Sequence, residues 1–345
     1  MKKKSSTRTA IDLFSGCGGL TQGLRDAGFA VGAAVEIDPL AAETYAANHP
    51  DVKLFNADIR GIPASEIMKT CGLAKGELDL LAGCPPCQGF SRIRLNNKKE
   101  RMDDPRNRLI DEVLRLVGEL RPKVVMLENV PNLARYTRYL NFKRKLRKLG
   151  YDVVDKVLDV ADFGVPQRRK RLVVLASRLG QIAHPMPADQ RKTVRDAIAV
   201  LPTDVLENDI LHNLGERRSE QVRQLIKAIP RDGGSRTALP PDLTLKCHEK
   251  RDGFYDVYGR MKWDDVSPTI TGGCVNPSKG RFLHPSEDRA ITLREAALLQ
   301  SFPTGYVFSL RKGKHAVAEM IGNALPPMFS RVQADLIWKH LAAQC

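Results

Sequence analysis

Short apolar runs alternate with amphipathic stretches through the first 180 residues of the 345-residue chain. Residues 109–120 (LIDEVLRLVGEL) repeat apolar side chains with the period of a helix that has one buried face. Runs rich in Val, Ile and Leu predict strands at 9–14, 31–37, 52–56, 78–83, 123–129, 151–160 and 171–177. This alternation predicts the α/β class: a doubly wound, mostly parallel sheet that binds ligands at the carboxyl ends of its strands.

The pattern changes after residue 180. Residues 181–290 are rich in proline and glycine and hold few periodic segments, which predicts a domain of irregular loops. Helical periodicity returns at 292–302, where Thr292 and Glu295 have the spacing of a capping box, and again near the C-terminus. These helices are too few to form a core alone. We therefore expect a first domain at 1–180, a second at 181–290 and a segment at 291–345 that returns to the first.

The charge of the chain indicates a polyanionic partner. Lys and Arg number 55 against 40 Asp and Glu, a formal net charge of +15. Residues 91–108 hold seven basic and three acidic side chains, and residues 135–148 hold seven basic and no acidic ones. A solvated helix face explains the second run alone, but two such runs around the cysteine motif at 84–87 favour a cleft that binds a nucleic-acid backbone.

Other bulk features narrow the cellular setting. The seven cysteines are thinly scattered, which favours a reduced cytoplasm over a framework of disulfides. No segment approaches the unbroken apolar run that a membrane span needs, so we expect no membrane partner.

A glycine-rich turn follows the first predicted strand, in DLFSGCGGLTQGL at 12–24. Thr21 stands where a dinucleotide site has its third glycine, and no Lys follows as in a P-loop. An ordinary strand–helix turn is an equally good reading of the glycines alone. Glu36, after the second strand, can bond a ribose, and Asp58, after the third, can accept from an adenine amino group, although either acid alone is more often a helix cap. Together they indicate a site for a nucleoside that is bound without a phosphate-binding motif, such as the nucleoside of S-adenosylmethionine.

The stretch AGCPPCQGFS holds Cys84 and Cys87 on either side of two prolines. One CxxC supplies only half of a zinc site, and a redox pair belongs in a thioredoxin-like frame. A thiolate nucleophile needs a positive surrounding, which the basic residues at 92–108 can supply. The residues alone leave nucleophile and structural cysteine equally open. Glu128, at the end of a strand, and the basic run QRRKR at 167–171 converge on the same rim of the sheet.

Six blocks follow one another along the chain: DLFSGCGGL, CPPCQGFS, ENV, QRRKR, LREAALLQSFP and IGNALPP. In this order they resemble the DNA (cytosine-5) methyltransferases of the bacterial modification type, over almost the full length. The resemblance implies a Rossmann-like fold that uses S-adenosylmethionine. It also implies that residues 181–290 are the variable target-recognition domain, and that the protein acts in the bacterial cytoplasm.

The resemblance assigns the chemistry to particular side chains. Cys87 would be the nucleophile that adds to C6 of a cytosine flipped out of duplex DNA, whereas Cys84 stands where other members often have glycine and would take no part. Glu128 would contact the ring nitrogen N3. The remaining catalytic positions would be Asn129, Arg169 and Arg171.

The resemblance also implies a cofactor site. Ile37 stands where some members carry Trp, so its contact with the adenine should differ in shape. No metal is implied, because methyl transfer from a sulfonium needs none. The implied contacts with S-adenosylmethionine are Phe14, Gly16, Cys17, Gly19, Glu36, Ile37, Asp58, Ile59, Pro86, Leu109 and Asn323.

The expected partner is double-stranded DNA, on which the enzyme would act as a monomer, with a cognate restriction endonuclease acting separately. Two alternatives remain. A branch that methylates cytosine in tRNA shares the same blocks, and a catalytically silent relative would bind DNA only. The intact Cys87, Glu128 and glycine turn argue against the silent relative.

Overall fold

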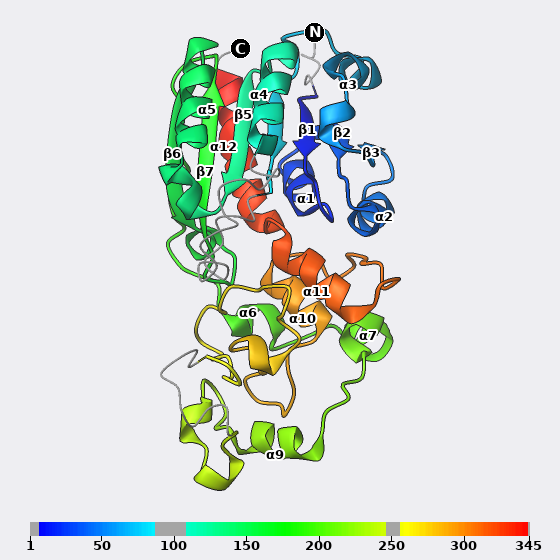
Figure 1. The fold of residues 1–345 in the computed structure, drawn as a ribbon, viewed down its shortest axis with the longest axis vertical. Helices are drawn as coiled ribbons and strands as arrows, with labels where there is room; N and C mark the ends of the chain where they lie inside the picture. Colours follow the sequence, from blue (N-terminus) through cyan, green and yellow to red (C-terminus); the bar gives the residue numbers. More distant parts are fainter. Residues whose placement is uncertain (1–6, 87–107, 246–255, 344–345) are drawn as a thin grey trace, which may run out of the picture. The chain divides into compact units, whose positions relative to one another are not determined.

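The computed structural model describes residues 7–86, 108–245 and 256–343 (Figure 1). The chain divides into two compact units. The first unit consists of residues 1–160, 170–187 and 325–345, and the second of residues 161–169 and 188–324. Cys87 and nearly all of the basic segment 91–108 lie outside the described residues.

The first unit is built on a sheet of seven strands among the described residues, in the order β3-β2-β1-β4-β5-β7-β6. Neighbouring strands from β3 to β5 are parallel, and β7 is antiparallel to both β5 and β6. All the predicted strands form and the predicted α/β class is confirmed. The strands are β1 (Thr9–Leu13), β2 (Ala30–Val35), β3 (Lys53–Phe55), β4 (Leu80–Gly83), β5 (Val124–Asn129), β6 (Asp152–Asp159) and β7 (Lys170–Ser177).

Helices cover both faces of this sheet. Side chains of α3 (Ala64–Cys71), α4 (Leu109–Leu120) and α5 (Thr137–Lys148) join the strands in one buried core. On the other face α1 (Gly19–Asp26) packs along α12 (Pro327–Ala343), and Figure 1 shows α12 behind the sheet and α4 in front of it. The short α2 (Pro39–Asn48) follows β2. The order of strands reverses at β1 and β4, where such sheets form their ligand crevice.

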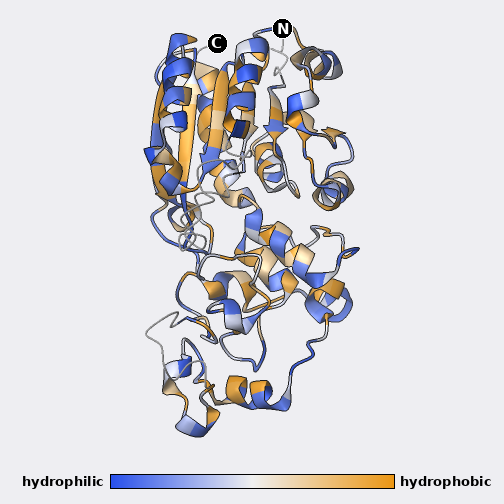
Figure 2. Cartoon of the chain, in the orientation of Figure 1, coloured by the Kyte–Doolittle hydropathy of each residue, from blue (hydrophilic) through white to orange (hydrophobic). Residues whose placement is uncertain are grey.

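Helix α4 has the predicted bounds and shows why periodicity located it. Its buried residues recur at helical spacing, while Figure 2 shows polar residues along its opposite face. Acidic side chains in its first turn complement the positive end of the helix dipole. The buried residues are Ile110, Val113, Leu116, Val117 and Leu120.

The second unit consists of short helices and irregular chain. Its helices are α6 (Val194–Ile198), α7 (Thr203–Asn208), α8 (Ile210–Asn213), α9 (Glu220–Ala228), α10 (Leu293–Leu299) and α11 (Gly313–Asn323). The expected texture of irregular loops is present. Residues 325–345 belong to the first unit, whereas α10 belongs to the second unit, where it packs against α6, α8 and α11.

The capping box predicted at the start of α10 is confirmed. The Thr292 hydroxyl accepts from the Glu295 amide, and the Glu295 carboxylate accepts from the Thr292 amide. Glu295 is almost fully buried and also takes two hydrogen bonds of 2.7 Å from Arg289. One carboxylate thus caps the helix and fastens the preceding loop to it.

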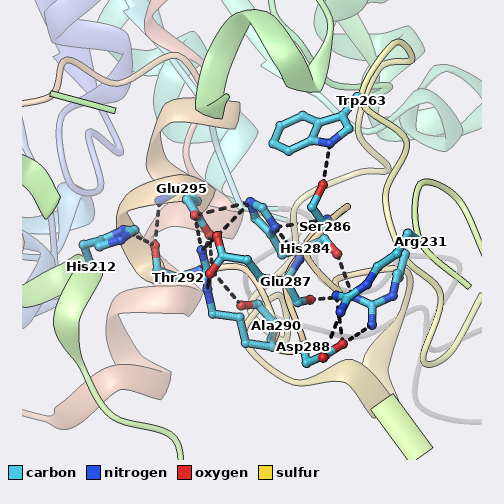
Figure 3. Close-up of polar contacts among 12 residues, drawn as sticks. His212, Arg231, Trp263, His284, Ser286, Glu287, Asp288, Ala290, Thr292 and Glu295 are labelled. Atoms are coloured by element: carbon cyan, nitrogen blue, oxygen red, sulfur yellow. Dashed lines mark hydrogen bonds and ion pairs between the residues drawn. The ribbon is translucent and has the colours of Figure 1, made fainter. Parts of the chain in front are cut away.

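Arg260 organises the loops around it from a fully buried position. Its guanidinium pairs with Asp288 at 2.6 Å, and Arg231 binds the same carboxylate at 2.8 Å from an exposed position (Figure 3). The other hydrogen bonds of Arg260 go to backbone carbonyls, which lack regular secondary-structure partners in such loops. These carbonyls belong to Ile226, Ile229, His284 and Glu287.

We predict that Arg260→Met lowers the free energy of unfolding of the second unit by about 3–5 kcal/mol, since it leaves buried acceptors without a donor. Arg231→Met is the matched control and should cost about 0–1 kcal/mol, because its side chain is exposed. Urea unfolding in a Trp338→Phe background would leave only Trp263, in this unit, as the fluorescent probe. Equal losses in the two variants would contradict the role of Arg260.

Candidate active site

A glycine-rich turn joins β1 to α1 at the strand-order reversal. Gly16 and Gly18 have φ angles of +55° and +96°, which glycine adopts without strain. Phe14 has a φ of +59°, an uncommon angle for a bulky side chain and one that often marks functional sites. The Ser15 amide donates to the Val35 carbonyl at 3.0 Å, which ties the turn to β2. Cys17 is buried, which raises the pKa of its thiol to about 12, and Gly19 begins α1.

Glu36 lies directly beside this turn. Its carboxylate accepts from the amides of Gly16 at 2.8 Å and Asp38 at 2.7 Å. Burial raises the pKa of Glu36 above its ordinary value, and these hydrogen bonds oppose that shift. Each carboxylate oxygen keeps a further lone pair for a ligand hydroxyl. The next residue, Ile37, is 61% exposed, so an apolar surface adjoins the carboxylate.

Asp12 carries a second carboxylate underneath the turn, and sequence reasoning did not identify it. Its Oδ2 accepts from the Thr21 hydroxyl at 2.7 Å, and Tyr45 hydroxyl lies 2.8 Å from the same Thr21 oxygen. Oδ1 is buried without a hydrogen-bond partner among the described residues. Complete burial raises the pKa of Asp12 to about 7. Thr21 was considered above only because it replaces the third glycine of a dinucleotide site. Its hydroxyl is the hydrogen-bond donor to Asp12.

The proline turn that leads toward Cys87 continues from β4. Its Cys84 amide donates to the Leu13 carbonyl at 3.2 Å. The Asn129 side-chain amide donates to the Pro85 carbonyl at 2.9 Å, which joins the turn to the end of β5. Pro86 is partly exposed and is the last described residue before Cys87. The strand pairing thus fixes the base of the turn from both sides.

Glu128 and Arg171 form an ion pair with an Nε–Oε1 distance of 2.6 Å. Glu128 lies opposite Val173 in the antiparallel β5–β7 pair, so the side chain of Arg171, two residues along β7, lies diagonally on the same face. Both side chains are largely buried. A carboxylate held by a guanidinium therefore stands at the end of β5, next to the proline turn.

Other predicted site residues lie in varied settings. Asp58 binds Arg60 through its carboxylate, which lowers the pKa of Asp58, and it caps the following turn. Ile59 is buried in the core, and Leu109 begins α4 half-buried against it. Because the Asp58 carboxylate already accepts hydrogen bonds from Arg60, only its remaining lone pairs are available to accept from an adenine amino group.

Arg169 and Asn323 belong to the second unit. The Arg169 guanidinium is buried and donates to the carbonyls of Ile270 at 3.2 Å and Gly322 at 2.9 Å. Asn323 ends α11 with an exposed side chain. These hydrogen bonds connect the QRRKR block to the IGN block.

The family model of the C-5 cytosine-specific DNA methylases matches residues 8–337. The chain belongs to this family. The methylase is thus a DNA (cytosine-5) methyltransferase, and the expected family is confirmed.

Relatives match over nearly the whole methylase. Type II methylase M.HgiDII of Herpetosiphon aurantiacus is 37% identical, covering 96% of this chain and 95% of that protein. Type II methyltransferase M1.HphI of Haemophilus parahaemolyticus is 35% identical, covering 96% of this chain and 87% of that protein. The crystal structure of a DNA modification methyltransferase from an E. coli prophage superposes with a TM-score of 0.71 at 27% identity, covering 97% of this chain and 100% of that one.

The family and fold imply S-adenosylmethionine as cosubstrate and DNA as substrate, and the residues of the glycine turn fit the cosubstrate. A Cβ built on Gly16 meets no atom within 4 Å, so the turn has open space above it. Beside that space lie the free lone pairs of Glu36 and the exposed apolar side chain of Ile37. A ribose and a flat aromatic base need these two kinds of surface.

The basic run at 135–148 lies mostly on helix α5. Helix α5 starts at the site edge after β5 and runs about 18 Å toward the opposite edge, where β6 begins. Arg138 pairs with Asp111, and Lys143 pairs with Asp155 at 2.9 Å. Only the first turn of α5 lies near the strand ends, so the run as a whole does not line the site.

Two features are absent from residues 7–86, 108–245 and 256–343. No helix among these residues is long and apolar enough to cross a membrane. No three His, Cys, Asp or Glu side chains in the same ranges gather so as to hold a metal ion.

We predict that Asp12→Asn removes a pH dependence of stability. The pKa of Asp12 is about 7 in the folded protein against an ordinary 3.8, so the folded state binds the proton more tightly. This contribution is complete below pH 4 and is lost as the pH rises through 7, on the order of 4 kcal/mol. Urea unfolding from pH 4 to 8 should show a shallower decline in Asp12→Asn than in the parent protein.

Asp26→Asn is the control, since this carboxylate on α1 is exposed. It should leave the decline unchanged. A parent-like decline in Asp12→Asn would show that Asp12 does not carry the buried proton.

Proposed function

We propose that the methylase transfers a methyl group from S-adenosylmethionine to C5 of a cytosine within a specific duplex DNA sequence, through a covalent bond between Cys87 and C6. The ion pair of Glu128 and Arg171 carries the proposal. The pair lies at the end of β5, beside the proline turn that follows β4. The relatives that are named type II methyltransferases support a modification enzyme paired with a separate endonuclease.

The reaction begins with a cytosine flipped out of the stack, since its C5 and C6 are not accessible inside a duplex. The Cys87 thiolate adds to C6, and the electron pair of the C5–C6 bond moves toward C5 and the ring. Glu128 bonds N3 and offsets the charge that reaches the ring in the transition state. Arg171 pairs with Glu128. Arg169, supported by Arg171, holds the base and its oxygen O2, and Asn129 fixes the rim.

S-adenosylmethionine, when bound, supplies an electrophilic methyl group on a sulfonium. Carbon C5 takes this methyl group, after which loss of the C5 proton to a base releases the Cys87 thiolate. Glu36 binds the ribose hydroxyls, and Ile37 covers one adenine face. The other residues proposed to hold the cosubstrate are Phe14, Gly16, Cys17, Gly19, Asp58, Ile59, Pro86, Leu109 and Asn323.

We also propose residues 181–290 as the target-recognition domain. Base-edge readout in a groove requires loops of variable shape, and much of this segment lacks regular strands among its described residues. The net charge of +15 supports binding to the phosphate backbone.

We predict that duplex DNA with 5-fluorocytosine at the target traps the enzyme covalently, and only when S-adenosylmethionine is present. Fluorine cannot leave as a cation, so the adduct cannot eliminate after methyl transfer. Cys87→Ser should abolish trapping, because a hydroxyl is barely ionised near neutral pH. A denaturing gel measures the adduct.

Cys71→Ser and Cys84→Ala serve as controls and should still form the adduct at the end point. A persistent adduct in Cys87→Ser would refute the assignment of the nucleophile. Bisulfite sequencing of DNA from cells that express the methylase would identify the target sequence.

We predict that Glu36→Gln weakens S-adenosylmethionine binding at least about tenfold, since charge-assisted hydrogen bonds to the ribose contribute about 1.5–3 kcal/mol. DNA affinity should stay unchanged. Isothermal calorimetry measures the cosubstrate, with Glu43→Gln, an exposed acid on α2, as control. An unchanged affinity of Glu36→Gln for S-adenosylmethionine would contradict the proposed contact between Glu36 and the ribose.

A further inference from the structure

Most of the basic run of the sequence lies on helix α5, which holds six Lys and Arg residues and no Asp or Glu. Tyr139, Phe142 and Leu146 are buried in the core that joins α5 to the sheet. At about 100° per residue, Arg144 and Lys148 lie on the opposite side of the helix, and both are exposed. These cations therefore point away from the sheet, on the side of it that also carries α4 (Figure 1).

Arg144, Lys145 and Lys148 have no carboxylate partner among the described residues. Arg144 donates to a neutral side-chain amide at 2.8 Å. Lys145 and Lys148 are exposed and form no ion pair in the part of the chain that the structure describes. Lys143, by contrast, pairs with Asp155 at 2.9 Å on another side of the helix. Three positive charges of α5 therefore face solvent without a paired negative charge.

A groove of about 520 Å³ lies between α4 and α5. Arg138 lines this groove and pairs there with Asp111 of α4. Lys145 lines the same groove about two turns further along α5. The side chains of Thr137 and Asn141 also line it and supply neutral donors. An anion in the groove thus meets two cations and two neutral donors against one carboxylate.

The stability of the helix does not account for these charges. Lys145 and Lys148 stand in the last turn, where cations complement the helix dipole. Arg138 stands near the start of the helix, where the dipole is positive and a cation is unfavourable, and the first turn holds no acidic residue. Arg144 lies before the last turn, within which the dipole effect is concentrated. The arrangement therefore favours an anionic ligand over a merely stabilising role.

The spacing of the cations suits the backbone of duplex DNA, which is the substrate of the family. Arg138 and Lys148 are about 15 Å apart along the helix axis. One DNA strand carries a phosphate about every 3.4 Å along the duplex axis, so this length corresponds to about four or five phosphates. Phosphate oxygens accept from Arg, Lys, Thr and Asn side chains, which are the donors that this surface offers.

We propose that the basic face of α5, formed by Arg138, Arg144, Lys145 and Lys148, binds the phosphate backbone of duplex DNA. The proposal rests on the function proposed above for the identity of the substrate. It adds a contact that reads no sequence and that lies outside the proposed recognition segment 181–290. Because such a contact releases counterions, its strength falls as the salt concentration rises.

The salt dependence of DNA binding tests the proposal. The triple variant Arg144→Gln, Lys145→Gln and Lys148→Gln removes three cations and keeps residues that favour a helix. Fluorescence anisotropy measures the affinity of the full chain for a labelled duplex of random sequence over a range of salt concentrations. The slope of log K against log salt should become shallower by about 2–3, since each neutralised phosphate contributes about 0.9.

The triple variant Lys69→Gln, Lys75→Gln and Lys339→Gln is the matched control. It removes the same charge from exposed positions elsewhere in the first unit and should keep the parent slope. A parent-like slope in the α5 variant, or an equal loss in both variants, would overturn the proposal. A loss seen only with a transcribed tRNA in place of the duplex would also overturn it.

A second measurement uses the unmodified enzyme and needs no folded variant. Acetylation by an N-hydroxysuccinimide ester, followed by peptide mass spectrometry, reports the access to each lysine. Duplex DNA at low salt should slow acetylation of Lys145 and Lys148 at least about threefold, with Lys69 and Lys75 unchanged in the same sample. Equal rates with and without DNA at Lys145 and Lys148 would contradict the contact. Neither measurement requires methyl transfer, so both stay decisive even if Cys87 is not the nucleophile.

Discussion

The parallel hydrogen-bonded register of β1, β4 and β5 is the constraint on which the active site depends. Leu13, Gly83 and Leu127 stand in line across these strands, so the residues that follow them emerge at one edge. A Cβ on Gly83 would come within 2.7 Å of the Leu13 carbonyl, so glycine is required for this close approach. A shift of one residue in β5 relative to its neighbours would turn the side chain of Glu128 to the other face.

The second unit is not built on a sheet, so other interactions hold its loops in fixed positions. Its loops are held by side chains that bond backbone atoms: Gln167 accepts from the Ile270 amide at 2.8 Å, and Arg169 donates to the Ile270 carbonyl. A Cβ on Gly322 would lie 2.4 Å from the backbone of Thr271, so α11 touches this loop directly. Buried polar groups thus replace ladder hydrogen bonds, as the requirement to satisfy backbone amides and carbonyls demands.

Periodicity predicted the sheet and α4 because strands and helices leave local patterns in the sequence. The spacing of Thr292 and Glu295 likewise predicted the start of α10. The packing of α10 against α6 and α8 leaves no such local pattern, because these helices lie far from α10 in the chain. Asp12 was not singled out for a related reason. Complete burial raises its pKa, and a local sequence pattern inside a strand does not reveal that burial. The roles of the predicted contact residues remain predictions.

The anchors of the second unit bear on how such an enzyme changes specificity over evolutionary time. Gln167 and Arg169 bind the amide and carbonyl of Ile270, groups that every amino acid except proline provides. Arg260 likewise binds carbonyls at four positions. Side chains across the proposed recognition segment can therefore diverge while the attachment of its loops persists. Recombination between relatives can therefore exchange the residues proposed to contact DNA, while the hydrogen bonds that attach the loops are kept.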